Sequence, residues 1–93
     1  MARLSIFNDT VAQLCYDYLH GTLDETTNEK IYEAVHSVVD QKDAGAYVYE
    51  ITYHIGYVNS QLADVISEVT YKKRKKQIRD KLALINGLQE NNI

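Results

Sequence analysis

Apolar side chains recur at helical spacing near the start of the chain. Five of them follow one another at steps of three and four residues: Leu4, Phe7, Val11, Leu14 and Tyr18. This spacing places them on one stripe of a helix. Asn8 can cap a shorter version of the helix that begins at Asp9, and Gly21 suits the residue that ends it.

A second helix is predicted between Gly21 and about residue 40. Capping-box patterns begin at Thr22 and again at Thr26, so the first residue of this helix stays open. Its apolar face carries three branched side chains: Ile31, Val35 and Val38. The stretch 41–45, which is mostly polar and ends in glycine, is interpreted as a break.

Residues 46–69 carry two competing patterns. Seven apolar side chains repeat at steps of three and four: Val48, Ile51, Ile55, Val58, Leu62, Val65 and Val69. That repeat favours a helix. Tyrosine and isoleucine also alternate between Tyr47 and Tyr57, which is typical of a strand. Because a lone strand is unstable, we expect a helix over 46–57 and keep strand pairing across a dimer as the alternative.

The last part of the chain, about 70–88, predicts another helix. Its apolar side chains are spaced by four and three residues: Ile78, Leu82 and Ile85. No proline or glycine interrupts 57–86, so the last two helices can form one long helix. The apolar stripe changes phase near Tyr71, which predicts a kink or a change of packing partner. Residues 89–93 are expected to form a frayed tail.

Length and composition indicate one small domain. The chain has 93 residues, of which 45% are hydrophobic and 25% charged, as is ordinary for a soluble globular domain. We predict a single all-α domain over 1–93, with three or four helices in an antiparallel bundle or a long helical hairpin. Heptad-like spacing and a thin core favour a homodimer or larger homo-oligomer.

The net charge of −3 hides an asymmetry along the chain. Residues 1–69 carry three basic and eleven acidic side chains, whereas 70–93 carry seven basic and two acidic ones. Five basic residues are consecutive and are called the basic run below: Lys72, Lys73, Arg74, Lys75 and Lys76. Some of them must face away from any core. They are expected to be solvated, or to contact nucleic acid or an acidic protein surface, including that of a second copy.

No pattern in the sequence specifies catalysis. The single cysteine, Cys15, stands beside the apolar stripe and is expected to be buried and inert. Glu33 with His36, and Glu50 with His54, have spacings used in di-iron bundles, but the ordinary interpretation is exposed pairs on a helix. We expect no enzymatic activity, no cofactor and no bound metal.

The chain also lacks the signals of membrane insertion and secretion. No apolar run approaches the ~20 residues of a membrane span. The N-terminal residues reach charged and polar side chains too soon for a secretory signal. We therefore expect a cytoplasmic protein that does not bind membranes.

The segment around Gly56 resembles the helix-turn-helix of small repressors. That motif takes a glycine at its turn and a small residue four positions earlier, where this chain has Thr52. Ile55 stands just before the turn, and Leu62 and Val65 fit the buried face of a second helix. The resemblance covers about 20 residues of a degenerate pattern.

The resemblance implies that a recognition helix opens with three side chains able to hydrogen-bond to base edges: Asn59, Ser60 and Gln61. Lysines of the basic run would then contact phosphates: Lys72, Lys73, Lys75 and Lys76. Asp64 and Glu68 count against this interpretation, because both would bring negative charge towards the phosphates.

Tyrosine supplies eight of the nine aromatic residues. Three of them step by four residues and would form an exposed stripe on a helix: Tyr49, Tyr53 and Tyr57. Tyrosine is enriched at protein interfaces. The leading hypothesis is a small non-enzymatic protein that binds, and inhibits or sequesters, a protein partner through this stripe and the basic run. A helix-turn-helix DNA-binding regulator is the alternative.

Overall fold

The computed structural model describes residues 9–90, with side chains described up to residue 85. The elements in chain order are α1 (Thr10–Leu19), α2 (Glu25–His36), α3 (Gln41–Thr52), the 3₁₀ helix η1 (Tyr57–Asn59) and α4 (Glu68–Glu90). Residues 9–90 contain no strand, so the all-α prediction is confirmed and the strand alternative for 46–57 is wrong. Leu4 and Phe7, which were assigned to the first helix, lie outside the described residues.

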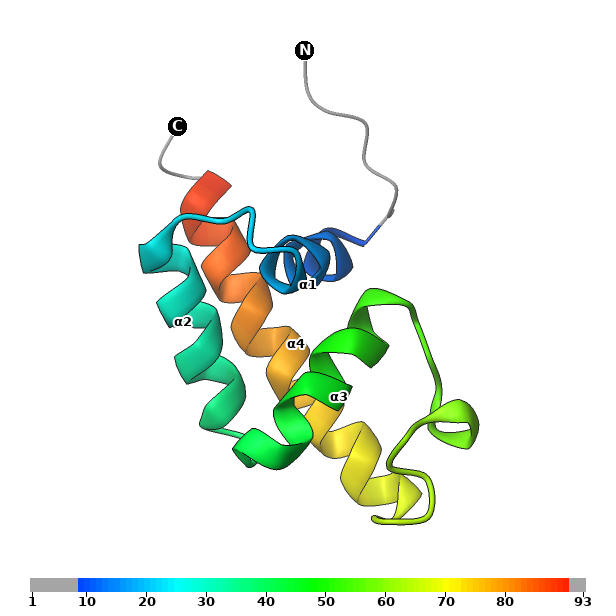
Figure 1. The fold of residues 1–93 in the computed structure, drawn as a ribbon. Helices are drawn as coiled ribbons and strands as arrows, with labels where there is room; N and C mark the ends of the chain where they lie inside the picture. Colours follow the sequence, from blue (N-terminus) through cyan, green and yellow to red (C-terminus); the bar gives the residue numbers. More distant parts are fainter. Residues whose placement is uncertain (1–8, 91–93) are drawn as a thin grey trace.

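Helix α4 contacts each of the other three α-helices and runs behind them in Figure 1. Helices α1 and α3 pack against each other and against α4, and α2 lies along α4 and also contacts α3. All four helices contribute fully buried side chains to one core: Cys15, Ile31, Ile51, Ile78 and Leu82. Among the described residues, no helix is both long and apolar enough to cross a bilayer.

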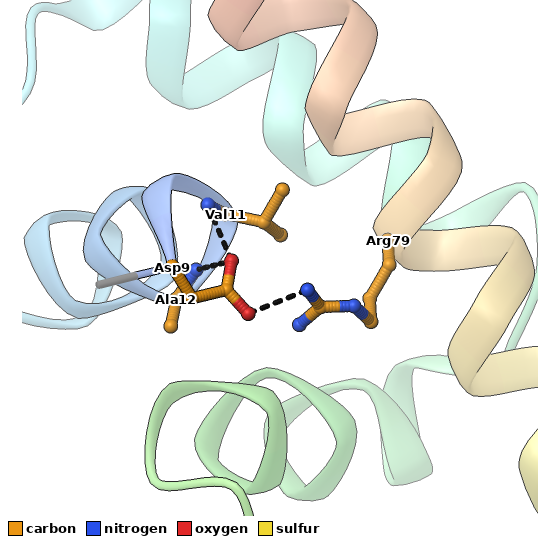
Figure 2. Close-up of polar contacts among 4 residues, drawn as sticks. All are labelled: Asp9, Val11, Ala12 and Arg79. Atoms are coloured by element: carbon orange, nitrogen blue, oxygen red, sulfur yellow. Dashed lines mark hydrogen bonds and ion pairs between the residues drawn. The ribbon is translucent and has the colours of Figure 1, made fainter. Parts of the chain in front are cut away.

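Helix α1 begins at a cap that also ties it to α4 (Figure 2). Oδ1 of Asp9 accepts hydrogen bonds from the N–H groups of Val11 at 2.9 Å and Ala12 at 3.2 Å. Oδ2 accepts from the Arg79 guanidinium at 2.5 Å. Burial acts to raise the pKa of Asp9, but Arg79 and the two N–H groups outweigh it, so that pKa lies below its ordinary value. One carboxylate thus caps a helix and joins it to a distant one.

Helices α1 and α3 end in the same kind of cap with different residues in the left-handed conformation. After α1, Gly21 has φ +67°, and the N–H of the next residue donates to the Asp17 carbonyl at 3.1 Å. After α3, His54 has φ +56°, and the next N–H donates to the Glu50 carbonyl at 2.9 Å. This pattern is the Schellman motif, which glycine fits best. Histidine pays a steric cost there that glycine avoids.

Helix α3 ends at Thr52, so the helix expected over 46–57 is confirmed as far as residue 52, and the one long helix that would join it to the last helix does not form. Residues 53–67 form a loop that contains only η1. The apolar repeat is not a core stripe: Leu62 is buried, whereas Val58 is 86% exposed and Val65 is also exposed. The left-handed residue after α3 turns the chain out of the helix, and hydrogen bonds within the loop replace the helical ones.

Other helix boundaries also differ from the prediction. Helix α2 begins after Asp24, and α3 begins after Asp40, inside the stretch 41–45 that was interpreted as a break. Polar residues suit the first turn of a helix, where N–H groups lack helical partners. Helix α4 begins after Ser67, whose Oγ accepts from an N–H of the first turn at 3.2 Å. It continues through Glu90, into the predicted tail, and 91–93 lie outside the described residues.

The left-handed caps predict opposite effects of two substitutions. His54→Gly should raise the free energy of unfolding by about 1 kcal/mol, because glycine adopts this backbone conformation without steric cost. Gly21→Ala should lower it by about 1 kcal/mol, since an added Cβ meets no atom within 4 Å and only backbone strain remains. Urea unfolding measures both changes. His54→Ala is the control: it removes the ring but keeps the strain, so a gain as large as that of His54→Gly would contradict the explanation.

The Asp9–Arg79 pair predicts a loss of stability in acid. A carboxyl group whose pKa is lowered by folding stabilises the fold above its unfolded pKa of about 4, and that contribution is lost as the pH falls through the folded value. Asp9→Asn keeps a capping oxygen but loses the charge, so it should cost about 1 kcal/mol at pH 7 and less in acid. Unfolding curves between pH 7 and pH 2 test this.

Asp80→Asn is the matched control, because it removes an exposed i,i+4 ion pair with Lys76 on the same helix as Arg79. Exposed pairs contribute little, so this change should stay below about 0.5 kcal/mol at every pH. Equal effects of the two substitutions would contradict a special role for Asp9.

Candidate functional site

Several of the predicted site residues surround one buried carboxylate, that of Glu50 in the last turn of α3. Its side chain is 0% exposed. Oε1 accepts hydrogen bonds from the Ser60 hydroxyl at 2.6 Å and the Tyr71 hydroxyl at 2.7 Å, and Oε2 accepts from the Gln61 N–H at 2.9 Å. An ionised carboxylate is tolerated in a protein interior only when such donors replace water. The loop after α3 therefore folds back over α3 and α4.

Lys75 brings a positive charge to this network from α4. Its Nζ donates to the Ile55 carbonyl at 2.5 Å and lies 5.2 Å from the centre of the Tyr71 ring. Burial lowers the pKa of Lys75, and the Glu50 carboxylate opposes that shift. One member of the basic run is thus used inside the molecule and is not available to a partner.

Tyr57 closes the loop and does not belong to an exposed stripe. Its hydroxyl lies within hydrogen-bonding reach of the carbonyl oxygens of Ala63 and Ile66, the latter at 2.6 Å. Its half-buried ring packs 5.5 Å from the ring of Tyr71. Tyr57 is therefore half-buried rather than part of an exposed stripe, and its single O–H proton is shared between two backbone carbonyls of the loop.

Tyr49 and Tyr53 do lie at the surface, as predicted. Their side chains are 45% and 44% exposed, and their ring centroids are 4.8 Å apart. Tyr49 stands one helical turn beyond Gly45 on the exposed stripe of α3. Of the three tyrosines predicted to form an exposed stripe, Tyr49 and Tyr53 are exposed and Tyr57 is half-buried.

The predicted recognition helix does not form. Asn59 is the last residue of η1, Ser60 is buried against Glu50, and Gln61 lies in the turn that follows. The Ser60 hydroxyl donates to the Glu50 carboxylate and accepts from the Leu62 N–H, so both of its hydrogen-bonding roles are used within the protein. Gly56 has φ −83° and does not make the left-handed turn that the motif requires. The helix-turn-helix interpretation of this segment is wrong in its second helix.

The other four residues of the basic run differ in exposure: three are exposed and one is half-buried. Lys72 and Lys76 are exposed and pair along α4 with Glu68 at 2.8 Å and Asp80 at 2.9 Å. Lys73 is also exposed. Pairs of this kind in water contribute little to stability, so these three ammonium groups stay available to a partner.

Arg74 is half-buried beside Tyr47, a fully buried residue of α3. Burial raises the pKa of the Tyr47 hydroxyl, and the Arg74 guanidinium opposes that shift. The ring of Tyr47 stacks on that of Tyr71 at 5.4 Å. Arg74 thus lies over the aromatic part of the core and is not a fully exposed surface cation.

Side chains with metal or nucleophilic chemistry are dispersed over residues 9–85. Glu50 is buried while His54 is exposed, so this pair shares no site. Glu33 and His36 belong to the surface of α2, and nowhere in the described part do three such ligands gather. Cys15 is buried, as predicted, and burial raises the pKa of its thiol to about 12.

A groove that the sequence did not predict lies between the end of α1, α2 and the start of α3, and is called the α1–α2 groove. Its acidic end, a hollow of about 560 Å³, is lined by side chains from α1 and α2: Tyr18, Leu19, Asn28, Glu29, Tyr32 and Glu33. Its apolar end, about 180 Å³, shares Tyr18, Leu19 and Tyr32. It continues over Val35 of α2 onto Gly45 and Val48 of α3.

The α1–α2 groove exposes large apolar side chains. Leu19 is 41% and Tyr32 is 47% exposed, although each adjoins a core position in the sequence. Leu19 and Tyr32 lie beside the apolar stripes of their helices and not within them. A large apolar residue in such a position is the signal in the sequence that indicates an exposed binding surface. The groove itself depends on how three helices meet, which periodicity along one helix does not report.

Comparison of the chain with protein-family models, with curated proteins and with solved structures finds no match. The surfaces described above are therefore the basis for a functional proposal.

The Glu50 network predicts a large cost for losing its carboxylate. Glu50→Ala should lower the free energy of unfolding by about 3–5 kcal/mol, because it opens space in the core and leaves buried hydroxyl and N–H donors without acceptors. Hydrogen exchange should show faster opening of amides in 53–67. Glu25→Gln, on the exposed surface of α2, should change stability by less than about 0.5 kcal/mol. A Glu50→Ala cost as small as that of the control would contradict the role of the network.

Proposed function

We propose that this protein is a non-enzymatic protein-binding module that holds a segment of its partner in the α1–α2 groove. The observation that carries the proposal is the exposure of Leu19 and Tyr32 on the walls of a hollow that leads to Val35 and Val48. A concave surface lined by apolar and aromatic side chains is the usual form of a binding site. A bound segment would cover apolar area that otherwise stays in contact with water.

Charge supports a partner segment of basic and apolar composition. Glu29 and Glu33 stand at one end of the groove, both exposed, and neither forms an ion pair within the described residues. The other end is apolar. An amphipathic segment with lysine or arginine beside hydrophobic residues would match both ends.

The proposal retains part of the surface expected from the sequence. Tyr49 and Tyr53 continue the exposed surface of α3 beyond the groove and would add contacts to a longer segment. Three exposed lysines of α4 can contact an acidic surface of a partner: Lys72, Lys73 and Lys76. A second copy of the chain presents the same lysines, and self-association through the groove is therefore one outcome of the test below.

The double substitution Leu19→Ala with Tyr32→Ala should abolish partner binding without unfolding the protein. Leu19 is 41% and Tyr32 is 47% exposed and neither belongs to the core, so the variant should keep its circular dichroism spectrum. A pull-down with the tagged full chain identifies the partner, and binding is then measured with purified proteins. Loss of two interface anchors should weaken binding at least about 30-fold.

Val58→Ala with Val65→Ala is the matched control, because both valines are exposed apolar residues of the 53–67 loop, outside the groove. This variant should bind as tightly as the original protein. Equal binding by the groove variant would overturn the proposal. Recovery of DNA, lost when Lys72, Lys73 and Lys76 become glutamine, would support a nucleic-acid-binding protein instead, and a dimer lost only in the groove variant would identify a second copy as the occupant.

A further inference from the structure

We infer that the acidic end of the α1–α2 groove is a recognition site for an arginine side chain supplied by the partner segment. This inference rests on the proposed function and specifies the chemistry of the group that the groove selects. The hollow brings together two carboxylates and two aromatic rings, and both kinds of group attract a flat cation that donates hydrogen bonds.

The carboxylates of Glu29 and Glu33 stand one helical turn apart on α2, at the mouth of the hollow. Like charges at this spacing repel each other. No lysine or arginine of the described residues pairs with either of them. A bound cation would relieve this repulsion, and a guanidinium can donate to two carboxylates at once through its fork of N–H groups.

The rings of Tyr18 and Tyr32 line the hollow, and the Tyr32 ring also packs against the His36 ring, with the two centroids 4.0 Å apart. The face of a tyrosine ring is electron-rich and attracts cations, and arginine stacks on such faces more readily than lysine does. Burial raises the pKa of Tyr18, followed by the effect of neighbouring Tyr32, so this phenol stays neutral. A hard metal ion fits this hollow poorly, because no three metal-ligating side chains gather in the described part of the chain.

The shape of the groove places an apolar contact beside the cation. The acidic and apolar ends share Tyr18, Leu19 and Tyr32 and so form one continuous surface. A partner segment that puts arginine between the glutamates would lay its neighbouring side chain on Val35 and Val48. The partner is therefore expected to present arginine next to a hydrophobic residue.

N-acetyl-arginine methylamide, which represents arginine within a peptide, is the direct probe. Titrated into the ¹⁵N-labelled full chain, it should shift the amide signals of Asn28, Glu29, Tyr32 and Glu33 with a dissociation constant in the millimolar range. The citrulline analogue has nearly the same shape without the charge and should bind at least about tenfold more weakly. The lysine analogue should bind with intermediate affinity. Equal binding of the citrulline analogue, or no shift with the arginine analogue, would overturn the inference.

Glu29→Gln with Glu33→Gln should weaken binding of the arginine analogue about tenfold, because both carboxylates are lost while the hollow keeps its shape. Asp64→Asn with Asp80→Asn removes the same charge from exposed positions outside the hollow and should change the affinity by less than about twofold. An unchanged affinity in the first variant would overturn the inference.

The two proposals fail separately. If partner binding is lost with Leu19→Ala and Tyr32→Ala but unaffected by Glu29→Gln and Glu33→Gln, the arginine site is wrong and the docking function stands. If the arginine analogue binds through the glutamates while the partner binds elsewhere, the docking function is wrong.

Discussion

The buried carboxylate of Glu50 is the constraint around which half of this molecule is organised. Carboxylate oxygens at 0% exposure need hydrogen-bond donors inside the protein, and the backbone N–H groups within α3 are used by the helix itself. Ser60 and Gln61 supply them from the loop, and Tyr71 supplies one from α4. The chain must therefore leave the helix after Thr52, turn back over it, and begin α4 where Tyr71 reaches the carboxylate. One acidic residue thereby sets the end of one helix, the path of a 15-residue loop and the register of the next helix.

The network also determines which charges remain for a partner. Lys75 and the hydroxyls of Ser60, Tyr57 and Tyr71 are engaged within the molecule, so they are not a binding surface. At the other side of the bundle, no internal cation pairs with the exposed glutamates of α2 within the described residues. The same rule explains both regions: a buried carboxylate is hydrogen-bonded within the molecule, and carboxylates without internal partners stay at the surface, where they can meet a ligand.

Sequence periodicity predicted helices well where one face of an amphipathic helix is buried. Val11 and Leu14, Ile31 and Val35, and Ile78 and Leu82 all lie in the core, as their spacing indicated. The same spacing failed over 53–67, because a helical repeat of valines records only which residues are apolar. It does not record that Glu50 needs the intervening hydroxyl and N–H groups, and Val58 and Val65 are consequently exposed. The groove was not predicted either, since Leu19 and Tyr32 line the same hollow only once α1 and α2 have both packed against α3 and α4.

The amino-acid sequence alone therefore determined the all-α class, most of the core and the buried thiol of Cys15, because these depend on hydrophobic spacing within single helices. It also indicated that Tyr49 and Tyr53 lie at the surface. The surroundings of Tyr57, Ser60, Tyr71 and Lys75 depended on contacts between residues 9 to 21 positions apart in the chain. The α1–α2 groove likewise exists only as the packing of three helices. Local patterns report which side of a helix is buried, whereas the partners of a buried charge and the shape of a surface arise from the assembled bundle.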